Sequence, residues 1–218
     1  KRSRRSSRLT VSANMIVACV KVGTKYGPEY VNRLASMVQR NTSRPYQFLC
    51  LTDDPTGLTC ATAPIGTGLP GWWAKLVLFK PHPQLKDQRV VFLDLDTVIV
   101  DNIDFLLDYD GPFAVLQDFN WPANWGSGCM SLAPGFGQQV WDKFTEYTAE
   151  MFPSDQEWVQ WQVKVADLWQ VLYPKKMVSY KVDQCEQGVP TGAAIVHFHG
   201  TPKPDELLHL PWLVEAWQ

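Results

Sequence analysis

The sequence lacks any run of about 18 apolar residues that could cross a membrane, and no apolar signal segment precedes its first strand pattern. It also lacks a Cys-x-x-Cys pair, and its cysteines are odd in number, which argues against a disulfide framework and against a structural zinc site. We therefore expect a cytoplasmic protein with buried free thiols at Cys19, Cys50, Cys60, Cys129 and Cys185.

Positive charge is scarce outside the first fourteen residues. The whole chain has a formal net charge of −2, and its first fourteen residues, the stretch KRSRRSSRLTVSAN, hold five cations and no acidic residue. Residues 15–218 therefore carry a net charge of −7. That balance argues against a nucleic-acid-binding body. The stretch itself cannot form a core. It is either a leader added ahead of Met15 or a basic, disordered tail that makes a peripheral contact with an anionic membrane.

Hydrophobic residues make up 45% of the 218 residues, enough for one substantial core. Strand patterns alternate with helix patterns, which predicts an α/β fold: a single domain over 15–218 with a mostly parallel central sheet and helices on both faces. The predicted strands are 15–22, 46–51, 89–95, 112–117, 129–134 and 193–199. One predicted helix begins near Pro28, and three more span 71–79, 135–150 and 155–172.

Two carboxylates interrupt the apolar stretch VVFLDLDTVIVDN at 90–102. On an extended strand Asp94 and Asp96 would share one face about 6.5 Å apart, with Leu95 on the other. Because no Lys or Arg is interleaved, a divalent cation is the economical counter-charge, and hard oxygen ligands suit Mg²⁺ or Mn²⁺. The alternative is that the carboxylates only end the strand in solvent.

The segment FLDLDTV also fits the haloacid-dehalogenase-type phosphatases, with Asp94 as nucleophile and Asp96 as acid/base. That resemblance requires a downstream acidic pair in a GDxxxD-like setting, and no such stretch follows residue 110. It also places the motif near the start of the domain, whereas Asp94 lies in the middle. A phosphatase is therefore the second hypothesis.

Six short segments occur in a characteristic order: VACVKVGT, LTDDP, WWAKL, FLDLD, WGSGCMSL and HFHGTPKP. In this order the chain from Met15 resembles nucleotide-sugar glycosyltransferases of the GT-A (Rossmann-like) fold, especially the glycogenin-like retaining family, family eight. The resemblance implies a metal-dependent transferase that moves a sugar from a nucleoside-diphosphate sugar, with UDP favoured, to a carbohydrate or other hydroxyl acceptor.

The resemblance also implies roles for particular residues. The metal ligands would be Asp94, Asp96 and His197, and an imidazole beside carboxylates favours Mn²⁺ over Mg²⁺. Donor-binding residues would be Lys75, Leu95, Gly200 and Lys203. Contacts to the sugar or acceptor would come from Ser127, Gly128 and Trp125, although Gly126 stands where the family commonly has asparagine. The catalytic residues beside the transferred sugar would be Asp155 and Gln156, with retention at the anomeric carbon; inversion with an Asp general base is the alternative.

Ser154 and Glu157 predict a capping box at a helix start, which would hold Asp155 and Gln156 rigidly. Downstream, an apolar stripe predicts one core-facing helix: Trp158, Trp161, Val165, Leu168 and Leu172.

Most of the ten tryptophans are expected in the core. Trp72, Trp73, Trp121 and Trp125 are the exceptions, since they flank the WWAKL and WGSGCMSL segments and could wall a sugar cleft. A non-catalytic carbohydrate-binding domain is accordingly the third hypothesis.

The last predicted strand carries His197. Because ligands of open α/β sheets bind beyond the carboxyl ends of the strands, we expect His197 and Lys203 to lie beside Asp94 and Asp96 at one edge of the sheet. His82, His199 and His209 are interpreted as ordinary core or surface histidines.

Overall fold

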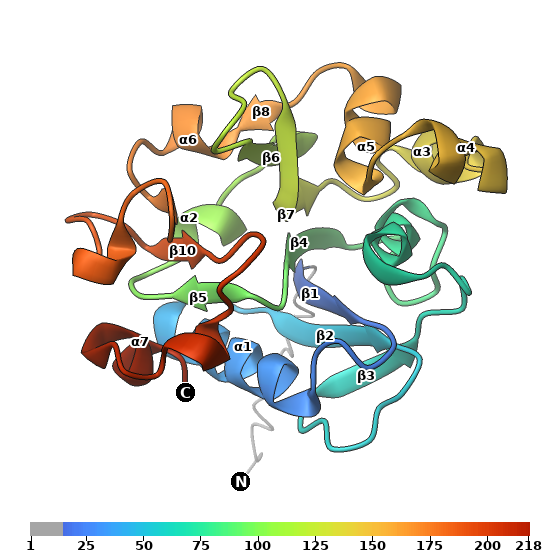
Figure 1. Ribbon diagram of the computed structural model, residues 1–218. Coiled ribbons are helices and arrows are strands. Elements are labelled where there is room, and N and C mark those ends of the chain that lie inside the picture. The colour runs from blue at the N-terminus through green and yellow to red at the C-terminus, as the bar shows by residue number, and fades with distance from the viewer. Residues whose placement is uncertain (1–14) are drawn as a thin grey trace, which may run out of the picture.

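The computed structural model describes residues 15–218, so the predictions for the basic N-terminal stretch lie outside the described residues. A seven-stranded sheet in the order β3-β2-β1-β4-β7-β6-β8 forms the centre (Figure 1). All of its strands are parallel except β7, which is antiparallel to both neighbours. The prediction of a mostly parallel α/β sheet is confirmed. The strands are β1 (Met15–Lys21), β2 (Gln47–Thr52), β3 (Ala61–Pro64), β4 (Arg89–Leu93), β6 (Phe113–Gln117), β7 (Trp125–Leu132) and β8 (Asp167–Leu168).

A second, three-stranded sheet contains the strand predicted at 193–199. It consists of β5 (Thr97–Ile99), β9 (Met177–Ser179) and β10 (Ile195–His197), in the order β5-β10-β9. The expectation that the last strand joins the central sheet was therefore wrong. Its apolar pattern is equally suited to pairing with the short strand that follows Asp96, and this is the pairing that forms.

The helices and 3₁₀ helices flank these sheets (Figure 1). They are α1 (Pro28–Asn41), η1 (Gly71–Phe79), α2 (Asp104–Leu107), α3 (Gln138–Asp142), α4 (Glu146–Met151), α5 (Asp155–Val163), α6 (Trp169–Leu172), η2 (Cys185–Gln187), η3 (Pro204–Leu207) and α7 (Pro211–Ala216). No helix within 15–218 is both long and apolar enough to cross a membrane.

Alternation along the strands builds two cores, one on each face of the central sheet. Val17 and Cys19 of β1 point into the core that includes α1 and the small sheet. Ile16 and Ala18 point into the other, which includes η1, α3 and α5. This period of two places helices on both faces, as predicted.

The two long helices predicted from 135 onward were wrong. Residues 135–150 form α3 and α4 with a break between them, and α5 ends at Val163, where Lys164 takes a positive φ of 69°. Trp158 is buried, but Trp161 is 58% exposed and Val165 is 80% exposed. The predicted stripe does not form one core-facing surface, because the helix ends at Val163 and the chain then forms β8 beside β6. Leu168 lies on β8, and Leu172 is 40% exposed.

All five cysteines are free. Four are buried, as expected of structural thiols, whereas Cys60 is only half-buried.

Candidate functional site

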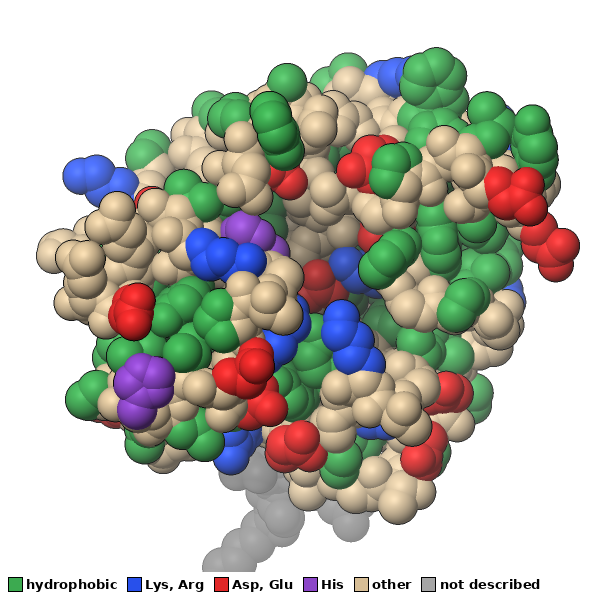
Figure 2. All heavy atoms as spheres, in the orientation of Figure 1, with side chains coloured by type: hydrophobic (Ala, Val, Ile, Leu, Met, Phe, Trp, Pro, Cys, Tyr) green, Lys and Arg blue, Asp and Glu red, His purple; other side chains and the backbone are tan. Residues whose placement is uncertain are grey.

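A pocket of about 750 Å³ opens where β1, β4, β6 and β7 approach the small sheet. In the space-filling view, acidic and basic side chains gather in a hollow at the centre of one face, with histidine at its edge (Figure 2). Residues far apart in the sequence meet there. Of the predicted site residues, those lining it are Lys75, Asp94, Leu95, Asp96, Ser127, Gly128, Asp155, Gln156, His197, Gly200 and Lys203.

Of the tryptophans expected at the cleft, Trp72 lines the pocket, whereas Trp73, Trp121 and Trp125 do not. Trp121 is 71% exposed in the loop before β7. Trp125 is buried instead. Its side chain is 8% exposed and packs on Phe113, with ring centroids 6.0 Å apart. It begins β7, where the period of two turns its indole into the core beside η1.

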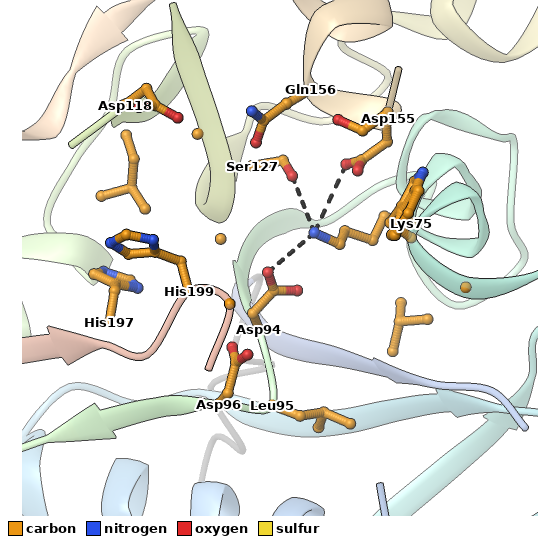
Figure 3. A pocket seen from close by; sticks show the side chains of 18 of the residues that line it. Lys75, Asp94, Leu95, Asp96, Asp118, Ser127, Asp155, Gln156, His197 and His199 are labelled. Atoms are coloured by element: carbon orange, nitrogen blue, oxygen red, sulfur yellow. Dashed lines mark hydrogen bonds and ion pairs between the residues drawn. The ribbon is translucent and has the colours of Figure 1, made fainter. Parts of the chain in front are cut away.

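Lys75 contacts two of the acidic side chains that line the pocket, Asp94 and Asp155. Its ammonium donates to Asp94 Oδ2 and to Ser127 Oγ, both at 3.0 Å, and lies 3.7 Å from Asp155 Oδ2 (Figure 3). Burial by itself would lower the pKa of Lys75, but the charges of Asp155 and Asp94 outweigh it and raise that pKa above the ordinary value. The lysine is therefore a fixed positive charge facing two carboxylates.

Asp94 and Asp96 lie on a turn, not on an extended strand. β4 ends at Leu93, and the Thr97 N–H donates to the Asp94 carbonyl oxygen at 3.1 Å. The backbone N–H of Asp94 is held by the Gly128 carbonyl oxygen of β7 at 2.9 Å. Burial, strengthened by the nearby Asp96 charge and opposed by Lys75, raises the pKa of Asp94 to about 6.

The Asp96 carboxylate contacts groups from two distant segments, one a cation and the other a hydroxyl group. The Lys203 ammonium contacts Asp96 Oδ2 and also donates to the Phe198 carbonyl oxygen at 2.9 Å. The Tyr26 hydroxyl donates to Asp96 Oδ2 at 3.0 Å. Although no Lys or Arg is interleaved with these carboxylates, Lys75 and Lys203 from distant parts of the chain supply positive charge to them.

His197 ends β10 and is buried, with an exposed fraction of 5%. Burial lowers its pKa to about 4, so the imidazole is neutral near pH 7, and its Nε2 has no hydrogen-bond partner within 15–218. His199 lies beyond the strand end, where its Nε2 is 2.7 Å from Ser179 Oγ and its ring stacks on Phe119. Both histidines line the pocket, although only one is on a strand.

Within the described residues, no three His, Cys, Asp or Glu side chains are gathered closely enough to hold a metal ion. The donor chemistry still fits one: carboxylate oxygens border the pocket together with a neutral imidazole whose buried Nε2 is unpartnered. Lys75 and Lys203 occupy the carboxylates in this arrangement. A cation at Asp96 would take the place of the Lys203 ammonium.

Asp155 is the first residue of α5 and is 2% exposed. Burial raises the pKa of its carboxyl group, and the charge of Lys75 opposes that rise. The predicted capping box does not form: Ser154 Oγ donates to Glu157 Oε2 at 2.5 Å and makes no backbone cap. The Asp155 Oδ2 atom is buried, has no hydrogen-bond partner within 15–218, and lies 3.7 Å from the Lys75 ammonium.

Several pocket residues were not predicted: Tyr26, Asp118, Phe119 and Asn120. Asp118 to Asn120 directly follow β6, so the rule that ligands bind at strand ends could have suggested them. Tyr26 lies in the turn after β1, and nothing in its local pattern indicates that its hydroxyl reaches Asp96.

No protein-family model and no curated protein sequence matches this chain. Solved structures do. The galactosyltransferase LgtC, in complex with donor and acceptor sugar analogs, is 12% identical with a TM-score of 0.61 over 87% of this chain and 89% of LgtC. The glycosyltransferase GlyE of Streptococcus pneumoniae TIGR4 is 12% identical with a TM-score of 0.62 over 87% of this chain and 56% of GlyE.

The bifunctional glycosyltransferase WbbM is 13% identical with a TM-score of 0.60 over 94% of this chain and 51% of WbbM. The chain thus spans about half the length of GlyE and WbbM. At these identities the likeness defines the fold, which is that of GT-A glycosyltransferases.

Proposed function

We propose that this protein is a glycosyltransferase that moves a sugar from a nucleoside-diphosphate sugar to an acceptor hydroxyl, as the family-eight resemblance implies. The observation that carries the proposal is convergence: five of the six sequence segments contribute side chains to one pocket. The sixth, LTDDP, supports the pocket from outside, because Asp53 Oδ2 accepts from the Gly23 N–H at 2.9 Å in the loop after β1.

Lys203 and Gly200 give one part of the pocket the properties that suit a bound diphosphate. Lys203 supplies a positive charge, and Gly200 adopts a positive φ of 72° that favours glycine where the chain passes the pocket. Tyr26 and Lys25 line the neighbouring wall beyond β1, where open α/β sheets bind nucleotides. We assign the nucleoside to this wall and the diphosphate to the part of the pocket lined by Gly200 and Lys203.

A divalent cation, Mn²⁺ by preference, belongs to the proposal, with Asp94, Asp96 and His197 as its ligands. When bound, it would stabilise the negative charge that develops on the departing diphosphate. Lys203, released from Asp96, would contribute to the same stabilisation.

In the transfer, the bond between the anomeric carbon and the β-phosphate oxygen breaks, and its electron pair leaves with the nucleoside diphosphate. The acceptor oxygen bonds to the anomeric carbon, and its proton passes to the diphosphate. Asp155 lies 3.7 Å from the Lys75 ammonium in the pocket and would stabilise a positively charged anomeric carbon. Retention is proposed because the family-eight resemblance implies it, and inversion with an Asp general base is the alternative.

The test is a thermal-shift panel of UDP, GDP and CDP with and without Mn²⁺, because a ligand that binds only the folded state raises the melting temperature. We expect a metal-dependent rise for one nucleotide and its loss in Asp96→Asn. The exposed Asp101→Asn is the matched control, since Asp101 only pairs with Lys176 at 3.6 Å.

Release of nucleoside diphosphate from a UDP-sugar in the presence of Mn²⁺ separates an enzyme from a carbohydrate-binding domain. Hydrolysis of p-nitrophenyl phosphate that Asp94→Asn abolishes would instead establish the phosphatase. Absence of both nucleotide binding and donor turnover in the wild type would refute the proposed transferase.

A further inference from the structure

The adjacent tryptophans of η1 have opposite environments. Trp73 is 8% exposed and packs on Phe144, with ring centroids 5.1 Å apart, so it anchors η1 to the core. Trp72 is 51% exposed and lines the pocket. An indole half in water at a pocket wall leaves a large apolar ring face available to a ligand.

Trp72 and Lys75 lie on the same side of η1. In a 3₁₀ helix residues i and i+3 are eclipsed, and three residues advance about 6 Å along the axis. Lys75 reaches the carboxylates of Asp94 and Asp155, whereas Trp72 is one turn nearer the start of η1. The exposed indole therefore belongs to the same pocket wall as the lysine that contacts these carboxylates.

The polar groups of the pocket fall into two sets. Asp94, Asp96, Tyr26 and Lys203 form the part assigned to the metal, nucleotide and diphosphate. Gln156 and Asn120 line the same pocket and offer amide groups that both donate and accept hydrogen bonds. A pocket that offers both an apolar ring face and amide groups is suited to a ligand that has an apolar face and a rim of hydroxyl groups.

We propose that Trp72 is the stacking platform for the acceptor, and that the acceptor is a pyranose sugar. The C–H groups on one face of a pyranose carry partial positive charge and pack against the negative face of the indole. Its hydroxyl groups remain free to bond with the amides and to attack the anomeric carbon of the donor. The inference rests on the proposed glycosyltransferase function and names its acceptor class.

The experiment uses a panel of p-nitrophenyl α- and β-glycosides of glucose, galactose and N-acetylglucosamine as acceptors with a UDP-sugar and Mn²⁺. For the best acceptor, we expect Trp72→Ala to raise the acceptor KM about tenfold to a hundredfold, the loss of one good stacking contact. The donor KM and the release of UDP without acceptor should change less than about twofold. Trp72→Phe should restore part of the affinity, because it keeps an aromatic face.

Trp161→Ala is the matched control, since Trp161 is 58% exposed on α5 but does not line the pocket. It should leave both KM values unchanged. Saturation-transfer difference NMR with wild type, UDP and the same glycosides provides a readout independent of turnover, and its signal should vanish in Trp72→Ala.

Two results would overturn the inference while leaving the proposed function in place. One is transfer to a glycoside with the same acceptor KM in Trp72→Ala as in the wild type. The other is hydrolysis of the donor with no binding or glycosylation of any panel sugar, for instance when a peptide hydroxyl is glycosylated instead. Failure of donor hydrolysis itself would refute the underlying transferase.

Discussion

His197 lies opposite Thr97 in the antiparallel pair of β10 and β5. Thr97 directly follows the turn that carries Asp94 and Asp96, and the Phe198 N–H donates to the Asp96 carbonyl oxygen at 3.3 Å. This pairing, not a common edge of the central sheet, brings the imidazole to the carboxylates. The coordination proposed for a metal therefore depends on the small sheet being intact.

We predict that His197→Ala lowers the Mn²⁺-dependent part of the nucleotide thermal shift by at least half, because it removes a neutral nitrogen ligand. The shift seen without metal should remain. His209→Ala, at an exposed position outside the pocket, is the control and should behave as wild type. An unchanged Mn²⁺ response in His197→Ala would remove this residue from the metal site.

Strand periodicity was sufficient to predict the α/β class and the two-sided core, because residues such as Val17 and Ala18 alternate between faces. It was not sufficient to predict partners. The stripe through Trp161 and Val165 satisfies a helix period, yet pairing of β8 with β6 ends the helix. Tertiary pairing overrode the local pattern there.

The same limit applies to the pocket. The short segments identified most of its lining, because they mark strand ends and a helix start. The counter-ions of Asp96 could not be predicted, since Lys203 and Tyr26 reach it only through tertiary folding.

Lys75→Met should destabilise the folded protein by about 3–5 kcal/mol at pH 7, because it leaves the buried carboxylate of Asp155 and the partly buried carboxylate of Asp94 without their shared cation. Adding Asp155→Asn should recover part of that loss by removing one uncompensated charge. Urea unfolding of the single and double variants measures both effects.

Lys86→Met is the control for that series, since the Lys86 ammonium is 3.9 Å from Asp87 and both side chains are mostly exposed. It should change the unfolding free energy by less than about 0.5 kcal/mol. A double variant no more stable than Lys75→Met alone would show that Asp155 does not depend on Lys75 for its charge balance.

The raised pKa of Asp94 predicts a pH-dependent stability. Its carboxyl group titrates near 6 in the folded protein and near the ordinary 3.8 in the unfolded chain. The folded state therefore retains a proton that the unfolded chain loses, and the stabilisation from Asp94 falls as the pH rises from about 4 to 6. Asp94→Asn cannot titrate, so its stability relative to wild type should increase by about 1–3 kcal/mol over that range.

The shifted pKa of His197 has the opposite effect on the pH dependence of stability. Its pKa of about 4 lies below the ordinary 6.5, so its contribution to stability is lost as the pH falls through that interval. The wild-type profile alone would mix the two groups, and the difference between wild type and Asp94→Asn isolates the carboxyl group. Urea unfolding at half-unit steps of pH from 4 to 7.5 provides the measurement. A constant difference would show that Asp94 is not perturbed.

The segment that carries Lys203 is tied to α1 through Tyr30, whose hydroxyl donates to Asp205 Oδ1. The Tyr30 ring also packs edge-on against Trp217, with centroids 5.1 Å apart, which places the C-terminal end of the chain against α1 (Figure 1). Tyr30→Phe keeps the ring but removes the hydrogen bond, which should cost about 1–2 kcal/mol. We expect the loss to appear as faster amide hydrogen exchange in residues 199–210, with the central strands unchanged.

Tyr46→Phe is the control, because the Tyr46 hydroxyl makes no hydrogen bond within the part of the chain that the structure describes. If UDP and Mn²⁺ bind through Lys203, their addition should slow exchange in the same segment and reduce the difference between Tyr30→Phe and wild type. Equal exchange in wild type and Tyr30→Phe would show that Asp205 does not hold the segment. If adding UDP and Mn²⁺ leaves the exchange rates at 199–210 unchanged while other pocket segments become protected, the diphosphate binds away from Lys203.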